Sequence, residues 1–235
     1  MAYAYRLRYN DGMKPLGSVS LIWSPEFAYA LGLLATDGNL SKDGRHFNLT
    51  SKDEEQLKNF MSCLGIKVKI GYKKSGYTGN LATQIQFGDV LLYRFLTNIG
   101  FTPAKTKTIG HLKIPSKYFF DFLRGHFDGD GYFYSYWDPR WKSSFMFYTC
   151  FVSASEKHLL WIRKKINTLL RIKGHISKGK TSTIYQLKYA KEESLKLLPN
   201  LYHSKKVVCL SRKRKKVDRA LKINLKHNLN NARVL

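Results

Sequence analysis

The chain carries two copies of one short motif, and this internal repeat constrains its architecture more than any other feature. The first copy reads ALGLLATDG and the second LRGHFDGDG. In this alignment Gly32 corresponds to Gly125 and Asp37 to Asp130. Three pairs of segments match in the same order along the chain: 30–38 with 123–131, 50–57 with 152–159, and 83–99 with 185–201. Matches in one order indicate a tandem duplication rather than two unrelated halves with generic helix patterns.

The two copies differ in length at one place. The offset between matching residues is 93 in the first pair of segments and 102 in the two later pairs. The second copy therefore contains about nine additional residues between its first helix and its next helix. The segment YSYWDPRWKSS (134–144) is the expected insertion.

Each copy is expected to fold as α-β-β-α-β-β-α, which gives an α+β protein with two pseudo-symmetric repeats. Ser24 followed by Pro25 predicts a helix start, because serine caps helix N-termini and proline is favoured at the first helical position. Ser116 is expected to begin the matching helix, and Asp53 and Ser155 to cap the next ones. The expected strands are 39–42, 45–51, 66–73 and 81–87, then 131–137, 145–153, 172–178 and 183–189, and the last helices are 89–99 and 191–201. The expected division is an N-terminal extension (1–23), a first lobe (24–112) and a second lobe with a basic tail (113–235).

The charge of the chain indicates a polyanionic partner. Lys and Arg number 41 against 16 Asp and Glu, a formal net charge of +25. Such a surplus destabilises a compact protein by self-repulsion, so nucleic acid is the first expectation and an anionic membrane surface the second. A basic structural protein of the ribosome is a further alternative. The tail from about residue 205 is expected either to form a helix along a phosphate backbone or to be a frayed end.

Cysteine usage and hydropathy give weaker expectations about the compartment. Three widely separated cysteines without CxxC spacing argue against a disulfide framework and a zinc site. No apolar run approaches the ~20 residues that span a membrane, and the N-terminus lacks the apolar segment of a signal peptide. We therefore expect an intracellular protein, in a bacterial or archaeal cytoplasm or an organelle matrix.

Glycines within the two motif helices predict that these helices pack against each other. Glycine inside a helix costs about 1 kcal/mol relative to alanine, a cost tolerated where another backbone must approach closely. Gly32 and Gly125 are therefore expected at the contact between the two repeats. Packing about a pseudo-two-fold axis would bring the equivalent helix ends, Asp37 and Asp130, face to face.

Two facing carboxylates at helix C-termini predict a divalent metal site. The helix dipole disfavours an acid there, and two neighbouring carboxylates repel each other further. Mg²⁺ prefers oxygen ligands and often uses one or two carboxylates together with substrate phosphates. We expect Asp37 and Asp130 as ligands, with the backbone carbonyls of Thr36 and Gly129 as further oxygens. Taken singly, each Asp-Gly would be an ordinary helix end and turn; their equivalent positions in the repeat favour the metal site.

These residues resemble the signature of the LAGLIDADG homing endonucleases, in the form that carries both motifs in one chain. The resemblance covers about residues 24–216. It implies a saddle-shaped monomer with two four-stranded antiparallel sheets that grip double-stranded DNA. It also implies Mg²⁺-dependent cutting of both strands across the minor groove to leave short 3′ overhangs, the metal being bound by the last acid of each motif, Asp37 and Asp130. Two or three divalent ions are expected, with Mn²⁺ or Ca²⁺ able to substitute in binding.

The surrounding residues depart from the family pattern. The sixth motif position holds Ala35 in one copy and Asp128 in the other, and we expect Asp128 to pack or cap at the helix end. Family members often place Gln or Lys beside the site at the end of the second strand; here Ser51 and Lys52 correspond to Ser153 and Ala154. A lysine after the last helix of each lobe is also expected near the site: Lys105, with Lys107 in reserve, and one of Lys206, Arg212 and Lys213.

Divalent ions can activate a water, neutralise phosphate charge and stabilise a leaving oxygen, so no covalent enzyme intermediate is expected. His126 lies in the second motif but is expected to pack or lie at the surface rather than act as a base. Lys52 and Lys105 are expected to stabilise charge, beside Ser51 and Ser153.

Alternate residues on one face of each sheet are expected to contact the major groove, Arg and Lys reading guanine and Asn and Gln adenine. The candidates are Asn39, Lys42, Arg45, Asn48, Lys67, Lys69, Lys73, Gln84 and Gln86, then Tyr134, Tyr136, Arg140, Lys142, Lys178, Lys180, Gln186 and Lys188. About half of them should point away from DNA. Unequal lobes favour a non-palindromic target. The rival functions are an RNA-binding maturase that aids intron splicing and a catalytically silent DNA-binding regulator.

Overall fold

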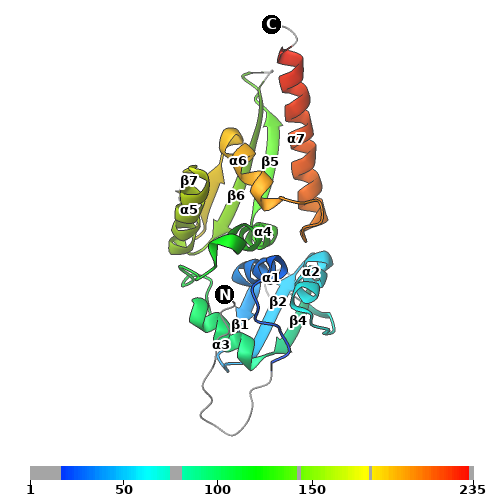
Figure 1. Cartoon of the computed structure of the whole chain (residues 1–235), viewed down its shortest axis with the longest axis vertical. Helices are drawn as coiled ribbons and strands as arrows, with labels where there is room; N and C mark the ends of the chain where they lie inside the picture. Colours follow the sequence, from blue (N-terminus) through cyan, green and yellow to red (C-terminus); the bar gives the residue numbers. More distant parts are fainter. Residues whose placement is uncertain (1–16, 75–80, 142–143, 180–181, 233–235) are drawn as a thin grey trace.

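The structure is a computed structural model that describes residues 17–74, 81–141, 144–179 and 182–232. The repeat expected from the sequence is present as two lobes stacked along the long axis of the molecule, with α1 and α4 between them (Figure 1). The first lobe contains α1 (Pro25–Thr36), β1 (Gly38–Leu40), β2 (His46–Ser51), α2 (Glu54–Leu64), β3 (Gly71–Lys74), β4 (Leu81–Gly88) and α3 (Val90–Ile99). The second contains α4 (Phe119–Gly129), β5 (Tyr132–Trp137), β6 (Phe145–Ser153), α5 (Glu156–Leu170), β7 (His175–Lys178), β8 (Tyr185–Tyr189), α6 (Lys191–Leu201) and α7 (Ser211–Ala232).

The two sheets have the same topology. Each is antiparallel and four-stranded, in the order β1-β2-β4-β3 and β5-β6-β8-β7. Their registers also match: Thr50 pairs with Gln84 in the first sheet, and the corresponding Val152 pairs with Gln186 in the second. The α+β fold expected from the sequence is confirmed, and the shared register supports the duplication.

The additional residues of the second lobe lengthen one hairpin. β5 and β6 pair over six positions, from Tyr132 opposite Cys150 to Trp137 opposite Phe145, whereas β1 and β2 pair over three. The loop after Trp137 completes the longer hairpin. The insertion expected at 134–144 is therefore confirmed in its position, and it makes the two lobes unequal.

Several local sequence signals act as expected. The Ser24 hydroxyl accepts a hydrogen bond from the Phe27 N–H at 3.0 Å, and Pro25 is the first residue of α1. Asp53 caps α2 through the Glu55 N–H at 3.2 Å. Each cap satisfies a backbone donor that the first turn of a helix leaves without a partner. These caps position α1 and the N-terminus of α2, which carry the residues of the site.

Other local expectations were wrong in detail. Ser116 does not cap α4; it begins a 3₁₀ turn (Ser116–Tyr118) and its carbonyl accepts from the Phe119 N–H. The hydroxyl of Ser155, at the N-cap position of α5, donates instead to the carbonyl of Ile109 at 2.5 Å. Strands were expected from residues 66 and 172, but β3 begins at Gly71 and β7 at His175. The alternating apolar residues before β3 are partly buried against the core without strand pairing, which accounts for the misleading pattern.

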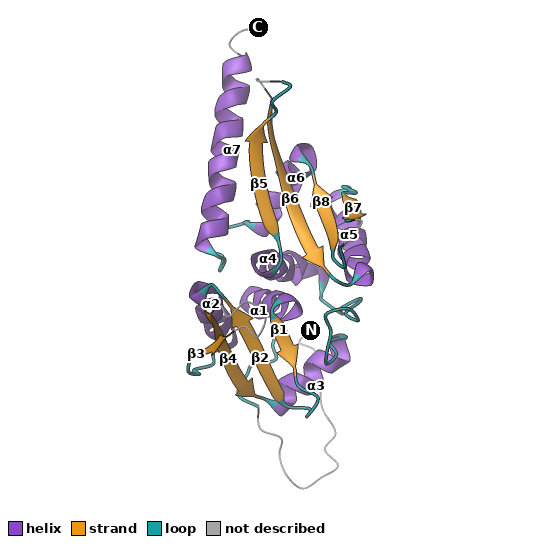
Figure 2. Cartoon of the chain, turned by 180° about the vertical axis from the view of Figure 1, so that it is seen from behind, coloured by secondary structure: helices purple, strands orange, loops and turns teal. Residues whose placement is uncertain are grey.

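Helices cover one face of each sheet and leave the other open. α5 and α6 pack on β6 and β8, and α2 packs on β2 and β4. Figure 2 shows the strands of both sheets in front of these helices. No helix within the described ranges is long and apolar enough to cross a lipid bilayer.

Candidate active site at the ends of the two motif helices

The helices α1 and α4 contact each other through their backbones. A Cβ atom on Gly32 would lie 2.6 Å from the backbone nitrogen of His126 and 2.8 Å from the Cα of Gly125. A Cβ on Gly125 would overlap the carbonyl of Tyr29. Any larger residue at either glycine would therefore force the two backbones apart. The helix packing expected at Gly32 and Gly125 is present.

The close approach continues to the C-terminal ends of the helices. A Cβ on Gly129 would overlap the Thr36 hydroxyl and lie 2.9 Å from a carboxylate oxygen of Asp37. Asp37 and Asp130 each occupy the C-cap position of their helix, with backbone angles of −88°, −7° and −93°, −3°. Their N–H groups donate to the carbonyls of Leu33 and His126 at 3.0 and 3.2 Å. The structure therefore brings the two predicted carboxylates together at equivalent positions.

The two carboxylates lie in an environment that disfavours their ionisation. Desolvation raises the pKa of Asp130 to about 6, and repulsion from the Asp37 carboxylate adds to the effect. The residue is exposed at the surface, and the neighbouring atoms of the two helix ends desolvate its carboxylate only in part. Burial also raises the pKa of Asp37. A hydrogen bond from Gln56 and the positive charges of Lys213 and Lys105 lower this pKa, but by less. A bound cation would relieve this repulsion.

Gln56 is a site residue that the sequence reasoning missed. Its side-chain nitrogen donates to the Asp37 carboxylate, and its oxygen accepts from the Ser51 hydroxyl at 3.1 Å. The side chain is buried, so the contact is held in place. The signal was its position in the first turn of α2, three residues after the Asp53 cap, which turns Gln56 back toward the end of β2.

The two expected serines occupy matching places, and the expected lysine beside one of them is exposed. Ser51 and Ser153 end β2 and β6, and each hydroxyl accepts from the N–H two residues later, at 3.0 and 3.1 Å. They therefore shape the turns into α2 and α5. Lys52 is exposed at the first of these turns, and Ala154 has no charge to match it.

Lys105 lies at the end of α1 as expected. The residue is 3% exposed, and its ammonium group donates to the carbonyl of Thr36 at 3.4 Å. Burial lowers its pKa to about 8, although Asp130 and Asp37 act in the opposite direction. Lys107 is exposed.

Among the three cationic residues left open for the second lobe, Lys213 is the one at the site. Its ammonium group donates to the carbonyls of Phe127, Asp128 and Gly131 at 2.6, 2.8 and 2.6 Å, and to that of Gly129 at 3.3 Å. Burial lowers the pKa of Lys213 to about 8 as well. Lys206 is exposed, and Arg212 pairs with Asp53 at 2.7 Å.

Both lysines place a positive charge at the end of a helix that terminates in an acid. Each ammonium group lies at the negative end of a helix dipole; Lys105 donates to one carbonyl there and Lys213 to four. The carbonyls of Thr36 and Gly129, the two oxygens expected as additional metal ligands, accept from these ammonium groups at 3.4 and 3.3 Å. Their role as metal ligands, beside the carboxylates of Asp37 and Asp130, stays a prediction.

The second motif also contains groups that serve packing. Asp128 is buried and accepts from the Tyr29 hydroxyl at 2.9 Å and from the Leu210 N–H at 2.7 Å. His126 is buried and stacks on His158, with ring centroids 5.2 Å apart. Burial lowers the pKa of His158 to about 4 and that of His126 well below its usual range. Both imidazoles are therefore neutral near pH 7 and hidden from the surface.

The open face of the first sheet is polar and carries five of the predicted DNA contacts. The register places the amides of Asn39, Asn48 and Gln86 side by side, with Gln84 and Lys73 further along the same face. Lys42 and Arg45 lie in the β1–β2 turn, and Lys67 and Lys69 lie in the segment before β3; all four are exposed. Their contact with DNA stays a prediction.

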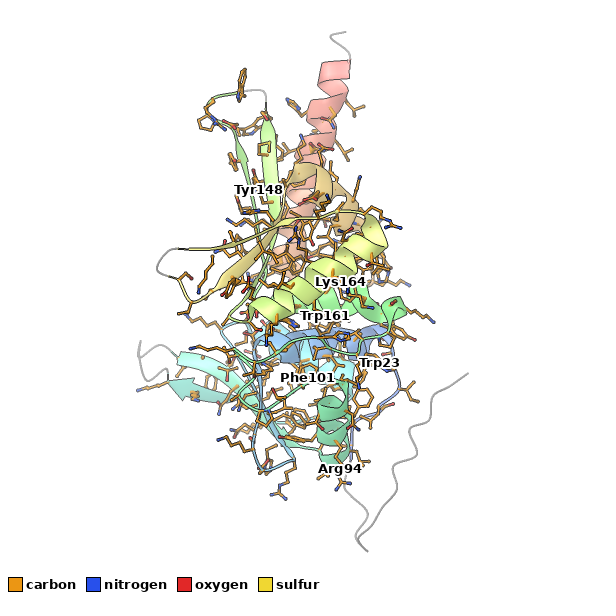
Figure 3. All side chains as sticks on the ribbon, turned by 90° about the vertical axis from the view of Figure 1, so that its left-hand side faces the viewer. Trp23, Arg94, Phe101, Tyr148, Trp161 and Lys164 are labelled. Carbon is orange, nitrogen blue, oxygen red and sulfur yellow. The ribbon has the colours of Figure 1, made fainter. Side chains whose placement is uncertain are left out.

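The open face of the second sheet is instead aromatic. Tyr134 stacks on Tyr148 with ring centroids 5.0 Å apart, and Tyr132 and Tyr136 continue the row at 5.9 and 6.3 Å from Tyr134. Gln186 accepts from the Tyr132 hydroxyl at 3.1 Å, and Lys188 lies on the same face. Tyr148, labelled in Figure 3, belongs to this row.

The other predicted contacts of the second lobe are placed differently. Lys178 pairs with Tyr185 in the ladder and lies over its ring at 4.9 Å, on the opposite face of the sheet. Arg140 lies in the β5–β6 loop, where it pairs with Asp138 at 3.0 Å. Lys142 and Lys180 lie outside the described residues.

Comparison with known proteins gives similarity in structure only. No protein-family model matches the sequence, and no curated protein matches it. The meganuclease I-SmaMI bound to an uncleavable DNA is similar with a TM-score of 0.58 and 16% identity, over 88% of this chain and 92% of that one. The N-terminal LAGLIDADG domain of DUF199/WhiA gives 0.53 and 18%, over 84% and 88%. I-DmoI in complex with DNA and Mn gives 0.50 and 16%, over 77% and 97%.

These neighbours share the arrangement described above. The chain therefore has the LAGLIDADG fold, as the motif resemblance implied. The neighbours include homing endonucleases solved with DNA and also a domain whose name mentions no nuclease. A fold hosts more than one function, so activity has to be argued from the site.

Proposed function

We propose that this chain is a site-specific endonuclease that hydrolyses one phosphodiester bond in each strand of a DNA duplex. The observation that carries the proposal is the pairing of Asp37 and Asp130. Two equivalent helix ends, joined backbone to backbone, present two carboxylates of the same geometry between two open sheets. One carboxylate for each strand would suit cutting of both strands across the minor groove.

The carboxylates fit a divalent cation. Both are oxygen donors, and the raised pKa values of Asp37 and Asp130 indicate negative charge that the protein only partly compensates. I-DmoI, similar in fold, has been solved with DNA and Mn and with DNA and Ca. We expect Mg²⁺ as the cofactor, in two or three sites shared with phosphate. When bound, such ions neutralise phosphate charge and make a water molecule more acidic.

The remaining site residues would orient the Asp37 carboxylate and compensate the negative charge of phosphate. Gln56 holds one orientation of the Asp37 carboxylate through its hydrogen bond. Lys105 and Lys213, buried at the two helix ends, are positioned to compensate negative charge that develops on phosphate, which is where fixed charges contribute most to rate. Lys52 is exposed and would reach a bound backbone from the first lobe only.

The proposed partner is a non-palindromic duplex bound by a monomer. The open face of the first sheet is rich in amides, which pair with adenine, whereas the second presents stacked tyrosines. Two different surfaces would read different half-sites. The net charge of +25 supports strong attraction to phosphates.

The decisive experiment is selection of cleaved duplexes from a random library with Mg²⁺. We expect one family of sites to be cut in both strands, with short 3′ overhangs. Asp37→Asn and Asp130→Asn should abolish double-strand cutting while leaving binding to the selected site within a few fold. Absence of cutting across the library would overturn the nuclease proposal, and tight binding without cutting would favour the DNA-binding regulator. If both variants still cut, the assignment of the site is wrong.

A further inference from the structure

The C-terminal helix α7 presents a row of basic side chains on one face. We call this row the basic stripe of α7; it consists of Arg212, Lys215, Lys216, Arg219, Lys222 and Lys226. Apart from the adjacent Lys215 and Lys216, these residues follow one another at intervals of three and four, so they share one side of the helix. All six are exposed. Of these six residues, only Arg212 forms an ion pair within the described part of the chain. The charges of the other five are therefore not compensated by such a pair there.

The contacts of α7 fix the direction in which the stripe points. Val217, Ala220 and Asn224 are buried, and they form the face that docks on the rest of the lobe. Arg214 lies over the ring of Tyr202 at 4.6 Å, at the end of α6 on the helix-covered side. Arg212, Lys216 and Arg219 lie about 140 to 160° around the helix axis from Arg214, so they turn toward the side of the molecule on which the sheets are open. Lys215, Lys222 and Lys226 project away from the docked face, into solvent.

The N-terminal end of α7 lies beside the active site. Arg212 pairs with Asp53, the N-cap residue of α2, which lies two residues after the end of β2. The Ser211 hydroxyl donates to the Glu55 carboxylate at 2.8 Å. From there α7 runs alongside β5, as Figure 2 shows from the open side of the sheets. The Trp137 ring at the far end of β5 still contacts His227 of α7, with centroids 5.3 Å apart. The stripe thus follows the second sheet from the active site to its outer end.

We propose that the basic stripe of α7 is a second DNA-binding surface, which contacts the phosphate backbone beside the half-site held by the second sheet. This inference rests on the proposed function and adds a partner surface to it. From Arg212 to Lys226 the stripe is about 21 Å long at 1.5 Å per residue, which matches about six base pairs of duplex. The tyrosine row of the second sheet carries no charge, so the stripe supplies the phosphate contacts that this sheet itself provides sparsely.

The test compares two triple variants that remove the same charge. Lys216→Gln/Arg219→Gln/Lys226→Gln removes three of the six charges of the stripe. Lys157→Gln/Lys164→Gln/Lys196→Gln neutralises three exposed lysines of α5 and α6, on the helix-covered side; Figure 3 labels Lys164. Binding to a selected duplex is measured over a range of salt concentrations. We expect the salt slope of the stripe variant to be smaller than that of the control by about 2 to 3 phosphate equivalents.

Shortening the duplex locates the contact. The site is shortened from each end in turn, and binding of the stripe variant is compared with that of the unmodified protein. One of the two truncations should remove the difference between them, and the other should leave it unchanged. Equal salt slopes for the stripe and control variants would overturn the inference. So would a stripe variant that binds duplex normally but loses binding to a structured RNA.

The outcome is separable from that of the proposed function. If the unmodified protein binds duplex without cutting it, the nuclease proposal fails while the salt slopes still decide the role of the stripe. If it cuts and the slopes are equal, only the inference about α7 fails. If it binds no duplex, both fail. Thermal unfolding of both triple variants verifies that neither is misfolded.

Discussion

Asp37 and Asp130 terminate the two motif helices with almost the same backbone angles, but only Asp37 accepts a hydrogen bond from another described side chain, that of Gln56. The residue that matches Gln56 in the second repeat is His158, and its Nδ1 atom faces the carbonyl of Gly110 at 2.8 Å instead. The two halves of the site are therefore equivalent in their carboxylates and unequal in the groups that support them.

Removal of Gln56 should slow cutting of one strand more than the other. A hydrogen bond to a charged group contributes about 1.5 to 3 kcal/mol, so Gln56→Ala should change the ratio of the two strand rates by about tenfold or more. Nicked plasmid should accumulate and can be followed on a gel. Ser62→Ala, an exposed position of the same helix, serves as control. An unchanged ratio would show that Gln56 does not support catalysis.

Substitution of Gly32 or Gly125, the glycines at the contact between α1 and α4, should destabilise the whole fold. The atoms that an added Cβ would meet at Gly32 and Gly125 are backbone atoms of the other helix, which cannot move aside as a flexible side chain can. We expect Gly32→Ala or Gly125→Ala to lower the free energy of unfolding by at least about 2 kcal/mol. Gly110→Ala is the control, because no atom lies within 4 Å of its added Cβ. Urea unfolding measures the three variants, and equal stability would refute the packing described above.

The two buried lysines should differ in their structural role. Lys213→Met leaves four carbonyls at the end of α4 without their donor, a loss of about 1 to 3 kcal/mol. Lys105→Met removes one bond of 3.4 Å and also a buried charge, so its stability should change little. Both variants should cut more slowly at saturating Mg²⁺. A Lys105 variant that is the less stable of the two would contradict this view of the site.

Stability without metal should depend on pH through Asp130. Its pKa rises from 3.8 to about 6 on folding, so between these values the unfolded chain is ionised while the folded one still holds its proton. The stability contributed by protonation is present at low pH and is lost as the pH rises through about 6. Asp130→Asn does not titrate, and it should exceed the unmodified protein in stability above pH 6 by about 1 kcal/mol, solvent screening being allowed for.

The difference between the two proteins should vanish near pH 4. Addition of Mg²⁺ at pH 7.5 should stabilise the unmodified protein and have a smaller effect on Asp130→Asn, because a ligand stabilises only the state that binds it. Thermal unfolding across pH, with and without Mg²⁺, measures both effects. Equal stability of the two proteins from pH 4 to 8 would show that ionisation of Asp130 does not destabilise the folded state.

The sequence predicted those parts of the molecule that depend on local patterns. The repeat identified the two acids and the glycines at the contact between α1 and α4. Cap residues such as Ser24 and Asp53 predicted helix starts correctly. Each of these signals lies within a few residues of the feature that it predicts, because backbone capping and close helix packing depend on residue type at fixed spacing.

The parts that the sequence missed or left undecided depend on contacts between distant segments. Lys213 reaches the end of α4 across more than eighty residues of sequence, and Gln56 meets Asp37 only when α2 folds back onto α1. Lys178 was placed on the wrong face because a shift of one residue along a strand reverses the side that a side chain takes. One signal for Lys213 was available: with Val217 and Ala220 it forms the buried side of α7, at helical spacing.

The backbone contact between α1 and α4 has a consequence for the products of the proposed cutting reaction. Gly32 and Gly125 bring the helices into contact without intervening side chains. The separation of the two carboxylates is therefore set by this helix contact and not by either sheet. The length of the overhang would then be independent of the recognised sequence. Variants with altered side chains on the open sheets would move the cut to other sites, and each new site would be cut with the same stagger.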